Sequence, residues 1–152
     1  MPELIKPTYE EMKYRQKLLR NTRTMDFNHE TIAFPEEEWQ KFMDEVVDCK
    51  CYCYRFIYCP GCGDFRGIAL YRYDCKKKVY FAHITVQADA RRMGYGAAGL
   101  KLLEAEAVKN GIDELHTFVF TDYAEGNHFA EKNGYIKEYE EDGMNYFVKK
   151  LQ

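Results

Sequence analysis

The sequence lacks the features that would place the protein in a membrane or on nucleic acid. No stretch of its 152 residues approaches the length and apolarity of a membrane-spanning helix, and its first residues carry no apolar run of signal-peptide length. It also lacks an excess of basic residues, because 22 Lys and Arg against 25 Asp and Glu give a net charge of −3. We therefore expect a cytoplasmic protein with no nucleic-acid or membrane partner.

Cysteine is absent from most of the chain, since all six cysteines fall between residues 49 and 75. A disulfide framework usually stabilises a small secreted domain, and no secretion signal is present, so we expect reduced thiols. The Cys59-Pro-Gly-Cys62 segment has the spacing of a zinc knuckle, but a second C-x-x-C pair is missing. We predict a hairpin turn that carries thiols and no metal site, with a small zinc-binding interaction protein around Cys49–Cys75 as an alternative.

The hydrophobic periodicity predicts an α/β fold. Apolar residues recur at helical spacing after Pro35, and from residue 51 the period changes to two, which is typical of strands. We expect helices at residues 9–20, from 35 onward, and at 94–110 and 122–133, and strands at 51–58, 65–73, 79–86, 115–120, 135–139 and 146–151. These predict a single domain over residues 1–152, with a twisted, mainly antiparallel mixed sheet of about six to seven strands flanked by about four helices.

The segment 86–97 has the composition of an anion-binding loop. A predicted strand ends at residue 86, and a polar turn carrying Arg91 and Arg92 follows it. Gly94 and Gly96 then open the next predicted helix, and glycines let the backbone approach a ligand without a Cβ in the way. The free amides and partial positive charge of a helix N-terminus attract anions. We therefore expect a pyrophosphate group here, with the arginines adding charge.

Two protein classes use such a loop. Gly94-x-Gly96-x-x-Gly99 satisfies the fingerprint of dinucleotide-binding enzymes. In that fold, however, a strand runs almost directly into the first glycine, whereas seven residues, Gln87–Met93, intervene here. The preceding strands also form a meander and not a parallel β-α-β unit, so a nicotinamide enzyme is disfavoured.

The second class agrees better with the chain. Arg91-x-x-Gly94-x-Gly96 resembles the R/Q-x-x-G-x-G/A signature of the GNAT superfamily of acyl-CoA-dependent N-acetyltransferases. The order of predicted elements from about Tyr9 to the end is similar to that of the family. A late family motif, Y-E-K-x-G-F, resembles the segment 130–135, Ala-Glu-Lys-Asn-Gly-Tyr. The resemblance implies a GNAT-like fold and acetyl-CoA as co-substrate.

The resemblance also implies how the coenzyme binds. Amides of residues 92–97 would hold its pyrophosphate, and the backbone of residues 84–86 would pair with the pantetheine arm as a strand does. The family's fourth and fifth strands splay apart to admit that arm, which here implicates Val86 and residues 115–120. The coenzyme-binding residues that we predict are Ile84, Thr85, Val86, Arg91, Arg92, Met93, Gly94, Tyr95, Gly96 and Ala97.

The chain departs from the family where many members place a catalytic tyrosine, because Ala130 stands there. That tyrosine is thought to protonate the departing thiolate. Tyr123, at a family ligand position seven residues earlier, is our candidate for this role, although it could equally be an aromatic packed under the turn. His128 and Tyr135 are nearby alternatives. The backbone N–H of Val86 is the candidate donor to the thioester oxygen.

The candidate general base is His83, three residues before Val86 on a strand that often supplies an acid or histidine in the family. The ordinary pKa of histidine, about 6.5, suits base work at neutral pH. A satisfied polar residue on a strand is the competing interpretation. Asp89 and His116 are weaker candidates, and His29 could line the acceptor site.

These observations predict an N-acetyltransferase that moves an acetyl group from acetyl-CoA to a primary amine by direct attack within a ternary complex. The acceptor would be a small molecule or a peptide, and a homodimer is left open. A non-catalytic acyl-CoA-binding regulatory module stays as an alternative because of Ala130. Release of free coenzyme A with an amine panel separates the two.

Overall fold

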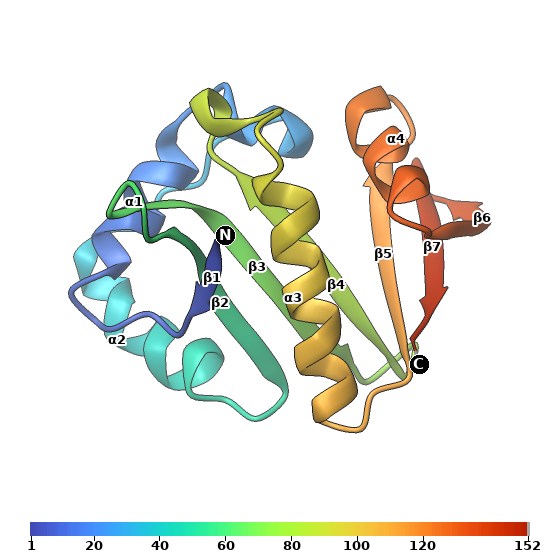
Figure 1. Cartoon of the computed structure of the whole chain (residues 1–152), viewed down its shortest axis with the longest axis horizontal. Coiled ribbons are helices and arrows are strands. Elements are labelled where there is room, and N and C mark those ends of the chain that lie inside the picture. The colour runs from blue at the N-terminus through green and yellow to red at the C-terminus, as the bar shows by residue number, and fades with distance from the viewer. Residues whose placement is uncertain (152) are drawn as a thin grey trace.

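The computed structural model of the chain describes residues 1–151, which form one seven-stranded sheet with helices on both faces (Figure 1). The strands are β1 (Glu3–Ile5), β2 (Tyr52–Cys59), β3 (Asp64–Asp74), β4 (Val79–Val86), β5 (Glu114–Phe120), β6 (Ile136–Glu141) and β7 (Met144–Lys150). The α-helices are α1 (Met12–Arg20), α2 (Trp39–Phe42), α3 (Tyr95–Lys109) and α4 (Ala124–Lys132). Short 3-10 helices are η1 (Thr24–Asn28), η2 (Glu36–Glu38) and η4 (Ala88–Ala90), and a π-helical turn is η3 (Met43–Val47).

The sheet has the order β1-β2-β3-β4-β5-β7-β6, and every neighbouring pair is antiparallel except β4 and β5. This confirms the predicted α/β architecture and the mainly antiparallel mixed sheet. The edge strand β1 was not predicted, because three residues are too few to show a period of two. The helix expected from Pro35 is a composite of η2, α2 and η3.

The N-terminal end of α1 follows from local chemistry. Thr8 and Glu11 make the reciprocal contacts of a capping box, in which Glu11 Oε1 accepts the Thr8 N–H at 2.9 Å. The turn between them is tight, so the regular helix begins at Met12 and not at Tyr9. Met12 is fully buried, which anchors this end of α1 to the sheet.

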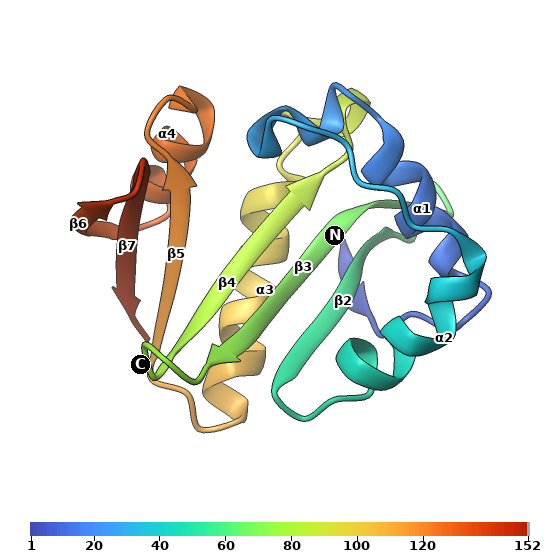
Figure 2. The same ribbon diagram turned by 180° about the vertical axis from the view of Figure 1, so that it is seen from behind.

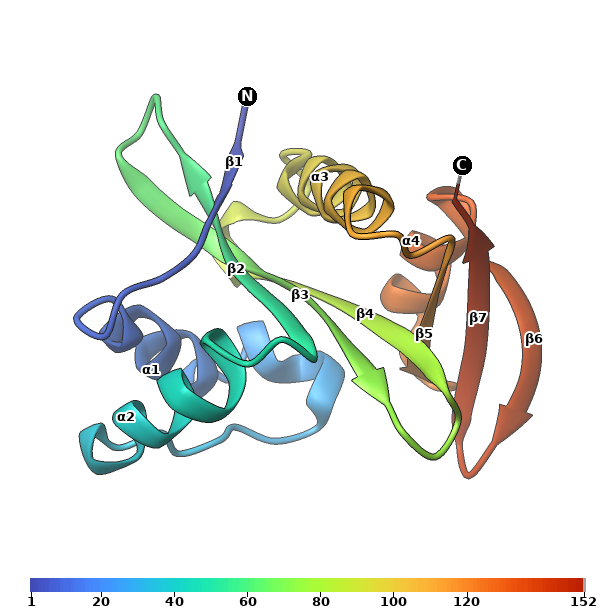
Figure 3. The same ribbon diagram turned by 90° about the horizontal axis from the view of Figure 1, so that it is seen from below.

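Two apolar cores sandwich the sheet. Helices α1 and α2 cover one face, and α3 and α4 cover the other (Figure 3). The α1–α2 core is built on buried residues that include Met12, Phe34, Trp39, Tyr54, Phe56 and Ile68. The α3 core includes Ile57, Ala69, Leu100, Leu103, Leu115 and Phe147. Burial of one such leucine contributes roughly 1.5–3 kcal/mol, so both layers hold the sheet in place.

The sheet opens between its two central parallel strands. Within residues 1–151, β4 and β5 share one pair of Cα partners, Phe81 and His116. Beyond that pair the strands diverge toward their carboxyl ends, as the view from behind shows (Figure 2). Each strand keeps its outer neighbour, since β4 pairs with β3 as far as Val86 and β5 pairs with β7 as far as Phe120. The divergence therefore leaves the inner edge of β4 without a partner strand.

Candidate functional site

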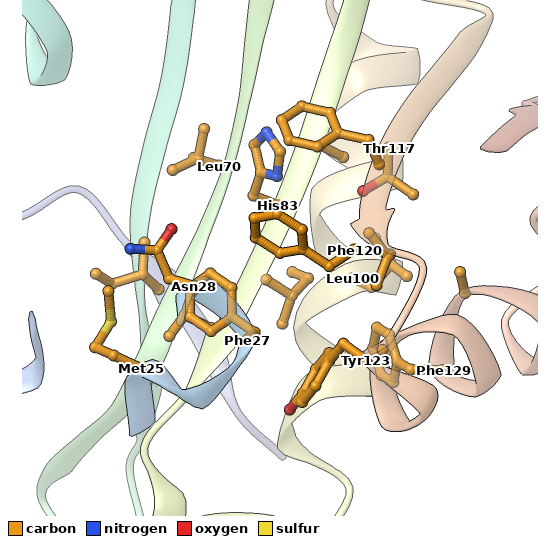
Figure 4. A pocket seen from close by; sticks show the side chains of 18 of the residues that line it. Met25, Phe27, Asn28, Leu70, His83, Leu100, Thr117, Phe120, Tyr123 and Phe129 are labelled. Atoms are coloured by element: carbon orange, nitrogen blue, oxygen red, sulfur yellow. The ribbon is translucent and has the colours of Figure 1, made fainter. Parts of the chain in front are cut away.

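The opening between β4 and β5 holds a cavity of about 390 Å³ that passes through the sheet. Its lining includes residues of the α1–α2 core, such as Leu19 and Ile68, and residues of the α3 core, such as Leu100 and Ala130. Figure 4 shows His83 in the cavity with Phe120 of β5 and Phe27 of η1. The cavity thus connects the two faces, so a ligand from one face can meet a ligand from the other.

The inner edge of β4 presents unpaired backbone groups to this cavity. Gln87 N–H donates to Arg66 O on β3 at 2.9 Å. Because N–H groups of successive residues in a strand point to opposite sides, those of Ile84 and Val86 point away from β3, toward the gap. An extended ligand can pair with these groups as a strand would.

The loop that follows β4 exposes a series of backbone donors. Within the described residues, no protein oxygen accepts from the N–H groups of residues 92–97. Arg92 and Gly94 have positive φ values of 65° and 88°, which turn the chain so that Tyr95 can open α3. An ideal Cβ on Gly96 would lie 3.2 Å from the Phe129 ring, so this glycine keeps the space between α3 and α4 open. Free donors at a helix N-terminus are the groups that suit an anionic ligand.

The two arginines of the loop occupy different environments. The Arg91 guanidinium donates to Thr24 O at 2.8 Å, to Val86 O at 3.3 Å and to both oxygens of Asp26. It therefore fixes η1 against the end of β4. The Arg92 side chain is 84% exposed, and its nearest carboxylate oxygen, on Glu125, is 4.0 Å away. Of these two arginines, only Arg92 is available to a diffusing anion, a difference that the sequence did not predict.

Replacing Arg91 by methionine should destabilise the fold by about 2 kcal/mol, since hydrogen bonds to charged groups contribute about 1.5–3 kcal/mol. Thermal unfolding should show a drop of roughly 4–8 °C. Arg92→Met is the matched control, and its melting temperature should stay within about 2 °C of the parent because the side chain is exposed. Equal drops in both variants would contradict the role assigned to Arg91.

His83 lies in the cavity, opposite Leu70 on β3 and at 4.9 Å from the Phe118 ring, centroid to centroid. No hydrogen bond to its ring is found within residues 1–151. Burial, reinforced by the charge of Arg72, lowers the pKa of His83 to about 4. The imidazole is therefore neutral at pH 7 with a free lone pair, and it is a weaker base than the ordinary value implies.

Tyr123 lines the cavity and reaches η1, where its hydroxyl donates to Asp26 Oδ1 at 3.1 Å. Burial, opposed by Arg91 and reinforced by Asp26, raises the pKa of Tyr123 to about 12. Ala130, 4% exposed, lines the same cavity. His29 completes the contact between η1 and β5, with its ring stacked 4.0 Å from Phe120 and its Nε2 3.2 Å from Asp122 Oδ1.

Five of the six cysteines fall into two separate groups. Cys59 and Cys62 lie at the β2–β3 turn, whereas Cys49, Cys51 and Cys75 lie at the opposite end of the same hairpin, where Tyr73 N–H donates to Cys51 O. Since β2 is eight residues long, about 25 Å separates its ends. Among the described residues, no group of three or more His, Cys, Asp or Glu could hold a metal ion. The geometry therefore gives the zinc alternative no four-thiol site.

Two polar contributions to the cavity wall were not predicted from the sequence. The Arg15 guanidinium lies over the rings of Phe34 and Phe42, at 4.4 and 4.0 Å from their centroids. Its Nε and the buried Tyr54 hydroxyl have no hydrogen-bond partner in the part of the chain that the structure describes. Both residues line the cavity. No local motif marks them, because they meet only through packing of α1 on β2.

Comparison with known proteins shows which family has this sequence pattern. The model of the acetyltransferase (GNAT) family matches residues 16–135 of the chain. No curated protein sequence matches significantly. No helix in residues 1–151 has both the length and the apolarity needed to span a membrane.

Several solved structures share the fold. A spermidine N-acetyltransferase from Vibrio cholerae, in complex with CoA and spermine, has a TM-score of 0.82 at 9% identity, with 99% of this chain and 95% of that chain covered. A GNAT-family acetyltransferase from Streptococcus pneumoniae has a TM-score of 0.80 at 16% identity, with both chains fully covered. The PaiA N-acetyltransferase from Thermoplasma acidophilum, in complex with coenzyme A, has a TM-score of 0.74 at 14% identity, with 99% of each chain covered. The match of the family model over most of the length, on a sheet that opens between β4 and β5, shows that this chain belongs to the acetyltransferase (GNAT) family.

Proposed function

We propose that the protein transfers the acetyl group of acetyl-CoA directly to a primary amine within a ternary complex. The observation that carries this proposal is the unpartnered inner edge of β4, continuous with the exposed amides of residues 92–97. Ile84 and Val86 would pair with the pantetheine arm, and the loop amides with Arg92 would hold the pyrophosphate. The Thermoplasma and Vibrio relatives are complexes with coenzyme A, which supports coenzyme A as the ligand.

The residues around the cavity divide the chemistry among them. Bound acetyl-CoA supplies the thioester carbonyl that the amine attacks. The Val86 N–H would donate to the developing oxyanion, because it points into the gap and has no strand partner. His83, neutral at pH 7, would accept the proton that the amine loses. The cavity would hold both substrates in line, which supplies much of the rate.

Tyr123 is the proposed proton donor to the departing thiolate. To donate its proton to the thiolate, the Tyr123 hydroxyl must leave Asp26. The contact with Asp26 helps to raise the pKa of Tyr123 to about 12, which opposes loss of the proton. Tyr123→Phe should lower turnover by about tenfold or more with unchanged coenzyme affinity. Adding Ala130→Tyr should recover part of the loss, because residue 130 lines the same cavity. Full activity of Tyr123→Phe would assign this proton to solvent.

The acceptor that suits this cavity is an amine that also carries a carboxylate. Within residues 1–151, no carboxylate lies within 4 Å of Arg15, and a half-buried unpaired cation favours an anionic ligand. The unpaired Tyr54 hydroxyl adds a neutral donor nearby. Polyamines, the acceptors named for the Vibrio relative, would instead meet repulsion from Arg15.

Arg15→Met should therefore reduce kcat/KM for amines that carry a carboxylate by about tenfold or more, because one charged hydrogen bond contributes about 1.5–3 kcal/mol. It should leave kcat/KM unchanged for amines that lack a carboxylate. Arg20→Met, an exposed change on the same helix, is the control. A preference for spermidine over amino acids in the parent protein would overturn this acceptor class without affecting acetyl transfer.

The function itself is tested in two steps. Acetyl-CoA should raise the melting temperature by mass action, and NADH should not. Release of free coenzyme A thiol should then depend on an amine, measured over amino acids, peptides, polyamines and aminoglycosides. Binding without release across the panel would favour a regulatory acyl-CoA-binding module, and absence of binding at millimolar acetyl-CoA would reject the proposal.

A further inference from the structure

The turn between β2 and β3 brings two thiols together. Cys59 ends β2, and Cys62 follows after Pro60-Gly61. The Cys62 N–H donates to Cys59 O at 3.2 Å and the Gly63 N–H to the same oxygen at 2.8 Å, with Gly63 at a φ of 72°. This closed turn holds the two Sγ atoms 2.8 Å apart. Cys62 is exposed and Cys59 is half-buried, so solvent reaches the pair.

The surroundings of Cys59 stabilise a thiolate. The Tyr95 hydroxyl donates to Cys59 Sγ at 3.4 Å, and the Arg66 guanidinium lies 5.8 Å from the Tyr95 ring centroid. The hydrogen bond between Cys59 and Cys62, followed by that from Tyr95, lowers the pKa of Cys59 to about 7. A substantial fraction of Cys59 is therefore ionised at neutral pH, which is the form that attacks sulfur.

We propose that Cys59 and Cys62 form a thiol–disulfide exchange site for low-molecular-weight disulfides, distinct from the acetyl-transfer centre. The Cys59 thiolate attacks one sulfur of the disulfide, the disulfide bond breaks, and one thiolate leaves and takes up a proton. Cys62 then loses its proton and attacks the Cys59 sulfur, releasing the second thiolate. The two cysteines lose two electrons and two protons in total, and the small disulfide is reduced to two thiols.

The remaining cysteines of the same chain lie in environments that differ from that of Cys59. Cys53 is 5% exposed and buried in the α3 core. Cys51 is exposed, but its hydrogen bond with Cys49 and the neighbouring thiol charge raise the pKa of Cys51. Exposure alone therefore predicts reaction at Cys51 and Cys75 as well as at Cys62, whereas the turn geometry predicts reaction at Cys59.

The test is reaction of the reduced full-length protein with oxidised glutathione at pH 7, followed by alkylation of free thiols and peptide mapping. We expect a Cys59–Cys62 disulfide, with Cys51 and Cys75 alkylated. Cys62→Ser should trap glutathione on Cys59, and Cys59 should react at least about tenfold faster than Cys51. Cys51→Ser is the matched control and should leave the rate unchanged.

Two results would overturn the proposal. One is glutathione spread over the exposed thiols, or a first disulfide among Cys49, Cys51 and Cys75. The other is stoichiometric zinc bridging the Cys59–Cys62 pairs of two chains, measured by metal analysis and the mass of the particle in solution. Neither result bears on acetyl transfer, which is measured separately by coenzyme A release.

Discussion

Gly94→Val should weaken coenzyme binding by about 100-fold or more, which corresponds to about 2.7 kcal/mol. Gly94 has a φ of 88°, a conformation that a β-branched residue adopts only with strain. Relief of this strain would rotate the peptide groups next to it and redirect the amides of residues 92–97. The added side chain would also fill space that is open in the structure and that the proposed pyrophosphate would occupy. Calorimetric titration with coenzyme A measures the loss.

The same helix offers a matched control at its other end. Gly111 has a φ of 81°, and an ideal Cβ there meets nothing within 4 Å, as at Gly94. Gly111→Val should therefore cost a similar roughly 1–3 kcal/mol of stability through backbone strain. Its coenzyme affinity should match the parent. If both variants bind coenzyme A normally, the loop is not the pyrophosphate site.

The proposed coenzyme loop could be predicted from the sequence because the pattern that marks it is local. The glycines, the preceding strand and the helix N-terminus lie within about a dozen consecutive residues, so one segment carries the whole pattern. Strand β4 shows the same principle, since the polar turn at residues 74–78 and the apolar run after it predicted the bounds Val79–Val86 that the structure has. Where neighbours in sequence are neighbours in space, the predicted strand and helix bounds were accurate, and coenzyme binding by the loop stays a prediction.

The cavity wall could not be predicted for the opposite reason. Arg91 and Asp26 are 65 residues apart, and Tyr123 and Asp26 are 97 apart. Such contacts depend on how α1 and η1 pack over the sheet, which no local pattern encodes. Two adjacent arginines, for which the sequence predicted the same electrostatic role, are therefore a structural residue and an exposed one. Arg15 lines the cavity although no local pattern marked it.

His83→Ala should lower kcat by about 100-fold or more, since general-base assistance contributes about 10²–10⁴. The imidazole faces the cavity with a free lone pair. With a pKa of about 4 it cannot remove a proton from a free ammonium ion, so the amine must bind neutral and His83 must act after attack begins. Because His83 stays unprotonated between pH 6 and 8, kcat should not fall through protonation of His83 in that range. Coenzyme affinity should be unchanged.

The same pKa has a consequence for stability that does not depend on catalysis. The folded-state pKa of about 4 lies below the unfolded value of about 6.5, so the unfolded chain binds the proton first on acidification. The contribution of His83 to stability is therefore complete above about pH 6.5 and is lost as the pH falls toward 4. In His83→Ala this loss is missing, so its melting temperature should fall less than that of the parent between pH 7 and pH 5.

His116→Ala is the control for the turnover measurement. His116 lies on β5 beside the last paired residue of β4, and its Nε2 is 2.7 Å from Glu114 Oε2, outside the cavity lining. Its turnover should stay within about threefold of the parent. A loss under about threefold in His83→Ala would remove His83 from the base role. If the acid dependence of the melting temperature were nevertheless reduced, His83 would have a structural role, and the proton would pass to solvent or to Asp89.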